Sequence, residues 1–331
     1  MWWKLLIAGI LLAAVVAGAM LYVAFYPVVP SQPVRLVIHR GETTSQVASG
    51  LDSLGLVRSK RLFIWWAKYR KIDRLLKPGR YEFTGPTAMT DIIDALRLGA
   101  PPVRVTIPEG WTVEKIAPRM ARELGTDSAA FVAETHDTVS LRRWGVRADR
   151  LEGYLLPETY EFYWGMTPVE VIDRMAQDGR AVFTDSLVRR MNSMGWDRHA
   201  VLTLAAMIEA ETGEASERRS VSGVFHNRLK LGMPMQCDPT VIYAMGGLPN
   251  GRPLVAKDLE FNSPYNTYLT LGLPPGPICN PGRAAILAAL YPDSTDDLYF
   301  VADGAGHHIF SRTLEQHNMA RMRVHREISR N

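Results

Sequence analysis

The feature that most constrains this chain of 331 residues is an uncharged run near its start, residues 5–26. A helix over these 22 residues is about 33 Å long, which is enough to cross the roughly 30 Å hydrocarbon core of a bilayer. Trp2, Trp3, Tyr22 and Tyr26 lie at or near the ends of the run, where aromatic rings favour the headgroup level. The run therefore predicts a single membrane-spanning helix.

The charge pattern around the run predicts its orientation. Lys4 and the amino terminus precede it, which favours a cytoplasmic N-terminus and places everything after Pro27 outside the cytoplasm. The alternative is a signal peptide cleaved near residues 17–19, but the apolar run continues well beyond that site. We therefore expect a single-pass protein of the cell (inner) membrane whose bulk is extracytoplasmic or periplasmic.

After a proline-rich linker, residues 27–34, a short sequence unit occurs twice. Residues 38–48 (IHRGETTSQVA) and 107–117 (IPEGWTVEKIA) share Ile, Gly, Thr and Ala at matching positions. Each copy combines a β-rich run, a glycine turn and apolar residues at helical spacing, which indicates a strand–turn–helix unit. The pattern predicts an α+β fold. Between the two copies, we expect Trp65 and Trp66 to serve packing rather than sugar stacking.

The second half of the chain combines helices with long aromatic and polar loops. Residues 168–193 predict one helix, and residues 198–212 are apolar on nearly all sides, which indicates a buried helix ending at Gly213. Ser216 is placed to cap the helix that follows. The loop-rich stretch after Gly232 is too polar and aromatic for a linker, so we interpret it as the walls of a cleft.

Two carboxylates at the end of the buried helix are candidates for catalysis. Glu209 and Glu211 are two residues apart, so their side chains point about 200° from each other and cannot both face one cleft. Glu211 shares a face with apolar residues in the last helical turn, where burial and the helix dipole raise a carboxyl pKa. A general acid needs such a pKa near neutral pH. The alternative is an ion pair between Glu211 and Arg218 or Arg219.

The remaining polar residues indicate other chemistries only weakly. A glycoside hydrolase requires a second carboxylate, for which the candidates are Glu152, Glu158, Glu217, Asp238 and Asp258. The histidines lack metal-site spacing, so we expect no metal and no cofactor. The chain has 38 basic and 34 acidic residues, and this small excess of positive charge does not indicate nucleic-acid binding. We expect Cys237 and Cys279 to be two separate buried thiols, and a disulfide between them is the alternative.

Three long stretches carry a composite pattern: IEAETGEASERRSVSGVFHNRLKLGMPMQCDPTVIYAMG, YNTYLTLGLPPGPICNPG and YFVADGAGHHIFSRTLEQHN. Together they resemble the endolytic murein transglycosylase family (MltG, or YceG-like) over about residues 150–320. The order of anchor, LysM-like module and catalytic domain also matches. The resemblance implies these domains: a cytoplasmic stub and transmembrane helix (1–26), a linker (27–34), a LysM-like glycan-binding module (35–100), a second strand–turn–helix or connecting region (101–150) and an α+β catalytic domain (151–331).

The resemblance also implies a lytic reaction on nascent peptidoglycan. Glu211, the second Glu of the ExET motif, would protonate the oxygen between N-acetylmuramic acid and N-acetylglucosamine. The muramyl C6 hydroxyl would then attack C1 and leave a 1,6-anhydro end, which terminates strand elongation. Substrate-binding or supporting roles are implied for the matching motif residues Glu209, Ser216, Glu217, Asn227, Gln236, Asp238, Tyr265, Asn266 and Tyr268.

The chain departs from the family pattern at its cysteines, since Thr is usual at Cys237 and a small residue at Cys279. Neither departure touches Glu211. The expected partners are glycan strands, the membrane and, by resemblance alone, cell-wall synthases. Two other functions stay open: a noncatalytic peptidoglycan-binding scaffold of the wall-synthesis machinery, and a muramidase-type hydrolase of the same bond.

Overall fold

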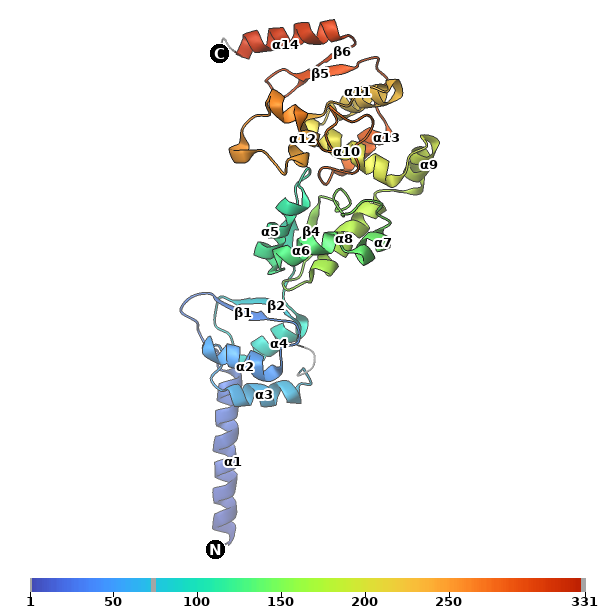
Figure 1. Cartoon of the computed structure of the whole chain (residues 1–331). Helices are drawn as coiled ribbons and strands as arrows, with labels where there is room; N and C mark the ends of the chain where they lie inside the picture. The colour runs from blue at the N-terminus through green and yellow to red at the C-terminus, as the bar shows by residue number, and fades with distance from the viewer. Residues whose placement is uncertain (1, 73–75, 329–331) are drawn as a thin grey trace. The chain divides into compact units, whose positions relative to one another are not determined.

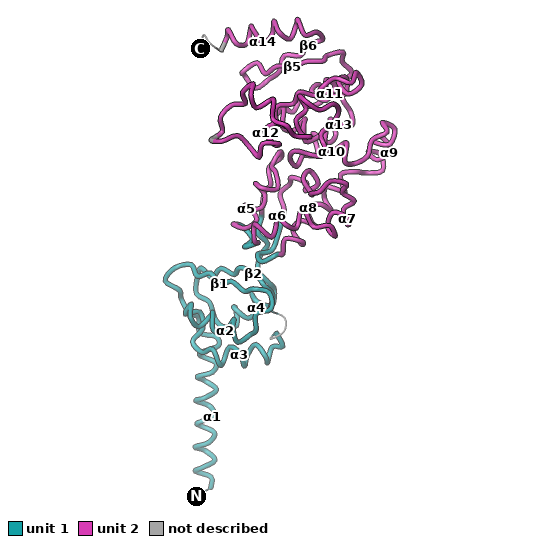
Figure 2. The backbone as a smooth tube through the Cα atoms, viewed as in Figure 1, with its two compact units in different colours: residues 1–104, 123–126, 161–166 teal, residues 105–122, 127–160, 167–331 magenta. Residues whose placement is uncertain are grey.

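The computed structural model (Figure 1) describes residues 2–72 and 76–328 and divides into two compact units, which Figure 2 shows in different colours. Unit 1 comprises residues 1–104, 123–126 and 161–166, and unit 2 comprises residues 105–122, 127–160 and 167–331. Residues 1, 73–75 and 329–331, which the expected domains include, lie outside the described residues. The fold is a helix-rich α+β fold with two-stranded sheets.

Unit 1 begins with a long apolar helix. Its elements are α1 (Trp2–Phe25), β1 (Val34–Ile38), α2 (Thr44–Ser53), α3 (Lys60–Tyr69), β2 (Gly79–Phe83) and α4 (Met89–Leu98). A window of α1 reaches a mean hydropathy of 2.5, so the helix is long and apolar enough to cross a membrane. This agrees with the anchor predicted from the uncharged run.

The strand–turn–helix repeat is present in both copies. In the first, Gly41 adopts a φ of +87°, and Thr43 caps α2 in a capping box with Gln46. In the second, Gly110 adopts a φ of +74° between β3 (Val103–Thr106) and α5 (Val113–Leu124). A left-handed glycine turn therefore separates strand from helix in each copy, as the sequence predicts.

The core of unit 1 lies between the β1–β2 pair and its helices. β1 and β2 are antiparallel, with Val34 opposite Phe83. Buried side chains from both strands and from α2, α3 and α4 form one cluster, in which Trp66 is partly buried. Trp65 is 52% exposed and stacks on Tyr69 at 5.7 Å, so Trp66 packs on the core and Trp65 packs at the surface.

The segment between α1 and β1 is attached to the rest of unit 1. The backbones of Val28 and Thr87 exchange two hydrogen bonds of 2.9 Å each. Arg58 donates a 3.0 Å hydrogen bond to the carbonyl of Pro27. These contacts hold the end of α1 against the module that follows it.

The strand β4 (Thr159–Phe162) begins in unit 2 and ends in unit 1. The remaining elements belong to unit 2: α6 (Ser128–Thr135), α7 (Thr138–Trp144), α8 (Pro168–Ala181), α9 (Asp185–Ser193), α10 (Arg198–Glu211), α11 (Arg218–Leu231), α12 (Asp238–Ala244), the 3₁₀ turns η1 (Pro249–Gly251) and η2 (Ala256–Glu260), α13 (Arg283–Leu290), β5 (Tyr299–Ala302), β6 (His308–Ser311) and α14 (Leu314–Ile328). α10 packs against α11, α12 and α13, and residues 201–208 are buried, as predicted for an all-round apolar helix.

Three local predictions in this unit are wrong. Residues 168–193 form two helices because Thr184 adopts an extended conformation at the start of α9. α10 ends at Glu211 with Thr212 extended, so Gly213 is not a left-handed helix terminator. Ser216 does not cap α11, because its hydroxyl donates a 2.8 Å hydrogen bond to the side chain of Glu214.

Candidate active site

The end of α10 directs its two carboxylates toward different partners. Glu209 accepts hydrogen bonds from Arg218 (3.2 Å) and from the backbone N–H of Gly282 (2.9 Å). Glu211 instead accepts a hydrogen bond from the thiol of Cys237. The two side chains therefore do not share one set of neighbours, as their helical spacing predicts.

The proposed ion pair of Glu211 with a following arginine is not formed. Arg218 lies between Glu209 and Glu109, at 3.2 and 3.6 Å. Arg219 lies 3.1 Å from Asp293. Within the described residues no ion pair reaches Glu211 at 4 Å or less, so that alternative is wrong.

Burial dominates the electrostatics of Glu211. It raises the pKa of the carboxyl from its ordinary value of 4.5 to about 7, and the negative charge of Asp238 acts in the same direction. The hydrogen bond from Cys237 and the positive charge of Arg228 oppose the rise without cancelling it. A carboxyl of this pKa is protonated in a large fraction of molecules near neutral pH and can both give and take a proton.

The neighbours of Glu211 come from α11, α12 and the loops after them. The phenol of Tyr268 donates a 2.5 Å hydrogen bond to Asp238, the first residue of α12. Arg228 of α11 donates to the side chain of Gln236 at 3.2 Å. Gln236 has a φ of +51°, a left-handed conformation that residues other than glycine rarely adopt. The structure thus gathers Glu211 with the predicted residues Gln236, Asp238 and Tyr268.

A cleft of about 750 Å³ in unit 2 reaches this end of α10, where Ala210 lines it. Its volume lies within the ordinary range of ligand sites, roughly 300–1,000 Å³. The predicted residue Tyr265 lines the cleft and its ring lies 5.1 Å from that of Tyr243. Polar and charged lining residues that the sequence analysis did not single out are Thr112, Glu114, Lys115, His136, Asp149, Arg150 and Ser263.

One signal in the sequence could have pointed to some of these lining residues. Thr112, Glu114 and Lys115 belong to the second copy of the repeated unit. We interpreted that copy only as a strand–turn–helix element. In the structure, this second copy also forms part of the wall of the cleft.

Four of the predicted supporting residues hold the fold instead of facing the cleft. Glu217 accepts two hydrogen bonds from His308, one from the backbone at 3.0 Å and one at the ring at 2.7 Å. The amides of Asn227 and Asn266 each donate to two loop carbonyls at 2.8 to 3.0 Å. Ser216 is exposed and bonds to its own turn.

Glu152 is a buried carboxylate with a raised pKa, but it is closed to a substrate. Its side chain is 1% exposed. Burial raises its pKa to about 8, against the charge of Arg150 at 3.3 Å. The N–H of Val113 and the amide of Asn280 also donate to it, at 3.2 and 2.8 Å. Glu152 therefore supports the wall of the cleft and does not offer a second catalytic carboxylate.

Asn280 joins three separate segments of this wall. Its side-chain oxygen accepts from the N–H groups of Gly153 (2.9 Å) and Leu155 (3.1 Å). Its backbone oxygen accepts from Gly110, and its amide donates to the carbonyl of Trp111 at 3.0 Å. Because Asn280 is fully buried, these hydrogen bonds are shielded from water.

The other hydrolase candidates have local partners. Asp258 accepts two hydrogen bonds from Arg252, at 2.7 and 2.8 Å, which lower its pKa to about 2. Glu158 accepts from the N–H of the next residue at 2.9 Å. Of the five candidate second carboxylates, only Asp238 affects the pKa of Glu211.

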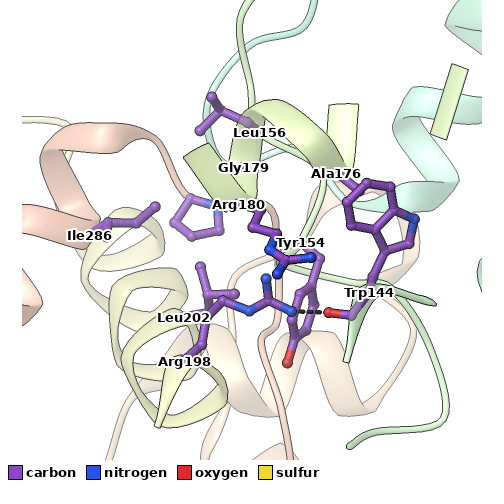
Figure 3. A pocket seen from close by; sticks show the side chains of 11 residues that line it. Trp144, Tyr154, Leu156, Ala176, Gly179, Arg180, Arg198, Leu202 and Ile286 are labelled. Carbon is purple, nitrogen blue, oxygen red and sulfur yellow. Dashed lines mark hydrogen bonds between the residues drawn. The ribbon is translucent and has the colours of Figure 1, made fainter. Parts of the chain in front are cut away.

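A second, much smaller cavity of about 10 Å³ lies at the opposite end of α10 (Figure 3). There the guanidinium of Arg198 points toward the carbonyl of Trp144, to which it donates, and lies 5.1 Å from the ring centre of Tyr154. A cavity of this size holds about one water molecule. It is a packing feature, too small for a sugar.

Both cysteines are free, buried thiols, which confirms the prediction of two separate thiols. The thiol of Cys237 donates to Glu211, and that of Cys279 lies 3.4 Å from the carbonyl of Ala206. Among the described residues, no group of three His, Cys, Asp or Glu side chains is placed to hold a metal ion.

Comparison with known proteins gives consistent results over most of the chain. A sequence model of the YceG-like family matches residues 36–323. A Bacillus subtilis (strain 168) protein named endolytic murein transglycosylase is 34% identical over 304 residues, which cover 87% of this chain and 84% of that protein. A protein of the same name from Streptococcus pneumoniae (strain ATCC BAA-255 / R6) is 31% identical over 80% of this chain, but this region is only 53% of its own length.

A solved structure is also similar. The crystal structure of a putative YceG-like protein from Listeria monocytogenes matches with a TM-score of 0.62 and 31% sequence identity. The match covers 87% of this chain and 98% of that one. The similarity therefore extends over both compact units.

Proposed function

Because the chain belongs to the YceG-like family, we propose that it is an endolytic lytic transglycosylase of peptidoglycan with Glu211 as its catalytic residue. The observation that carries this assignment is the state of Glu211 itself. It is a partly buried carboxyl with a pKa of about 7, its neighbour Ala210 lines the 750 Å³ cleft, and the thiol of Cys237 donates a hydrogen bond to it.

The reaction needs one group that acts as acid and then as base. Protonated Glu211 gives its proton to the oxygen between C1 of N-acetylmuramic acid and C4 of N-acetylglucosamine, and the C1–O bond breaks. The carboxylate then takes the proton of the muramyl C6 hydroxyl while O6 bonds to C1. The proton thus returns to Glu211, no water is consumed, and the product carries a 1,6-anhydro end. A pKa near 7 suits both steps.

The cleft is the proposed groove for the glycan strand. Tyr243 and Tyr265 offer aromatic faces on which sugar rings can stack, and Lys115 provides positive charge for carboxylates of muramyl groups or stem peptides. Arg150 is already paired with Glu114 at 2.5 Å and Glu152 at 3.3 Å, so it supports the wall. Tyr268 and Asp238 lie beside Glu211 and are proposed to orient it.

The N-terminal part is proposed to place this activity at the membrane. α1 would be a single-pass anchor with its N-terminus in the cytoplasm and both units outside. The module over residues 35–100, with its antiparallel β1–β2 pair, would be the LysM-like glycan-binding part. Activity on nascent strands and contact with cell-wall synthases follow as proposals from this location.

Product analysis tests activity and mechanism together. The purified full chain in detergent would be incubated with peptidoglycan, and the soluble fragments would be analysed by mass spectrometry. We expect 1,6-anhydro-muramyl ends. Reducing muramyl ends would instead show a hydrolase and refute the lytic step.

The catalytic assignment has its own matched pair of variants. Glu211→Gln keeps the size of the side chain and removes its acid, so cleavage should fall by several orders of magnitude. Glu260→Gln changes an exposed carboxylate of η2 and should cleave normally. Normal cleavage by Glu211→Gln would refute the assignment, and a wild-type chain that binds glycan without cleaving it would favour the scaffold function.

A further inference from the structure

The helix α3 and its ends form a surface that the glycan reaction does not use. Residues 58–71 contain six basic residues and no acidic one. Trp65 and Tyr69 on α3 are 52% and 68% exposed, and their rings stack at 5.7 Å with an interplanar angle of 8°. Contiguous exposed apolar surface, unlike single exposed residues, marks sites of interaction with a membrane or a partner. We call this set, Arg61, Trp65, Lys68, Tyr69 and Lys71, the α3 surface.

The α3 surface is fixed at the end of the apolar helix α1. The guanidinium of Arg58, just before α3, lies over the rings of Tyr22 and Tyr26, at 5.4 and 5.3 Å from their centres. Arg58 also donates hydrogen bonds to the carbonyls of Tyr26 and Pro27, at 2.5 and 3.0 Å. Phe25 of α1 contacts Trp66 of α3 edge to face at 6.0 Å.

Figure 1 shows the consequence for unit 1. α3 lies crosswise at the base of the module, where α1 enters it, and β1 and β2 lie on the side away from α1. If α1 spans a bilayer, its last residues lie at the headgroup level, and α3 lies at the same level. The bilayer surface is therefore the occupant that this face meets.

We propose that α3 is a membrane-surface helix, which inserts Trp65 and Tyr69 among the lipid headgroups and binds anionic lipid phosphates with Arg61, Lys68 and Lys71. This inference rests on the proposed anchoring by α1 but not on the proposed catalysis. Trp and Tyr favour the interface because their rings are apolar with one polar edge, and each added cation strengthens attraction to an anionic leaflet. With α1, the α3 surface provides a second point of attachment that restricts tilting of the module against the membrane.

A reporter at Lys68 tests the proposal and leaves both aromatic rings in place. The full chain with Lys68→Cys would carry a polarity-sensitive fluorophore, since the two native thiols are buried. It would be reconstituted in liposomes of phosphatidylcholine with and without phosphatidylglycerol. Glu82→Cys, an exposed position on β2, provides the matched control.

We expect brominated lipids to quench the label at position 68 several-fold more than the label at position 82, and aqueous iodide to do the reverse. Phosphatidylglycerol should increase the lipid quenching at position 68, and Arg61→Glu with Lys71→Glu should cancel that increase. Trp65→Ala and Tyr69→Ala, which change exposed side chains, should each reduce the lipid quenching at position 68.

Three outcomes would overturn the proposal. Equal iodide access at positions 68 and 82 would show that α3 faces water. Protection of position 68 by soluble glycan fragments and not by lipid would assign the aromatic pair to sugar binding. A chain that fails to float with the liposomes would refute the anchor itself. None of these readouts depends on cleavage, so Glu211→Gln should give the same fluorescence results as the wild type.

Discussion

Replacing Glu211 by Gln should stabilise unit 2 at high pH while it abolishes cleavage. Folding raises the pKa of Glu211 from 4.5 to about 7, and a pKa difference of one corresponds to about 1.4 kcal/mol, so the full effect is about 3 kcal/mol. The sign follows from the direction of the change. A carboxyl with a raised pKa favours the folded state when protonated, so this contribution is complete below pH 4.5 and is lost as the pH rises through about 7. The Gln side chain has no charge to bury at any pH, so the variant does not lose this stability as the pH rises.

Thermal unfolding of the full chain in detergent, at about pH 5 and about pH 8, measures this difference. A domain of 150–250 residues shifts its Tm by about 2–4 °C per kcal/mol. The Glu211→Gln variant should therefore unfold roughly 6–12 °C higher than the wild type at about pH 8, as an upper limit. At about pH 5 the difference should shrink to about a quarter of that value.

The same substitution two residues earlier provides the control. Glu209 is paired with Arg218 at 3.2 Å and accepts from Gly282, so Glu209→Gln should lower the Tm at both pH values. A Glu211→Gln variant that is no more stable than the wild type at about pH 8 would refute the reasoning. So would a gain in stability that does not change with pH.

Three further predictions concern the same unit. The initial rate of glycan cleavage should fall as the pH rises through about 7, because Glu211 then loses the proton it must donate; a flat profile across this range would contradict its role as acid. Cys237→Ser offers the carboxylate a stronger donor than a thiol and should move this falling limb to lower pH, whereas Cys237→Ala should move it to higher pH. Glu217→Ala removes both hydrogen bonds to His308 and should lower the free energy of unfolding by about 1–3 kcal/mol. The amide of His308 should then exchange its hydrogen faster, and unchanged exchange would show that other contacts hold β6.

The features that the sequence predicted well are those set by neighbouring residues. The apolar run became α1, the glycine turns Gly41 and Gly110 separate strand from helix, and the all-apolar stretch became the buried α10. The local failures have the same origin. Ser216 can bond either to its own turn or to the backbone of the next helix, and in the structure its hydroxyl donates to the side chain of Glu214 in the turn.

The site could be predicted only in part, because its parts are far apart in the sequence. The helical position of Glu211 was enough to indicate a raised pKa and a direction different from that of Glu209. No local pattern shows that Cys237 would donate to it, or that Arg150 would line the cleft next to it. Residues such as Asn227 match the family pattern, but their hydrogen bonds show that they maintain loops. The motif therefore predicted which segments surround Glu211, but it did not separate residues that could take part in the reaction from residues that maintain loops.

The hydrogen bonds of Asn280 also determine when the cleft can form during synthesis. Asn280 bonds to Gly153 and Trp111, which precede it by 127 and 169 residues. A chain made from its N-terminus at about 5–20 residues per second needs roughly 6 to 34 seconds to add that length. Until Asn280 arrives, Glu152 has only Val113 and Arg150 as partners among the described residues, and the hydrogen bonds that tie Gly110, Trp111 and Gly153 to residue 280 cannot form. The cleft is thus completed late in synthesis, and a chain interrupted before residue 280 carries Glu211 without the wall that completes its site.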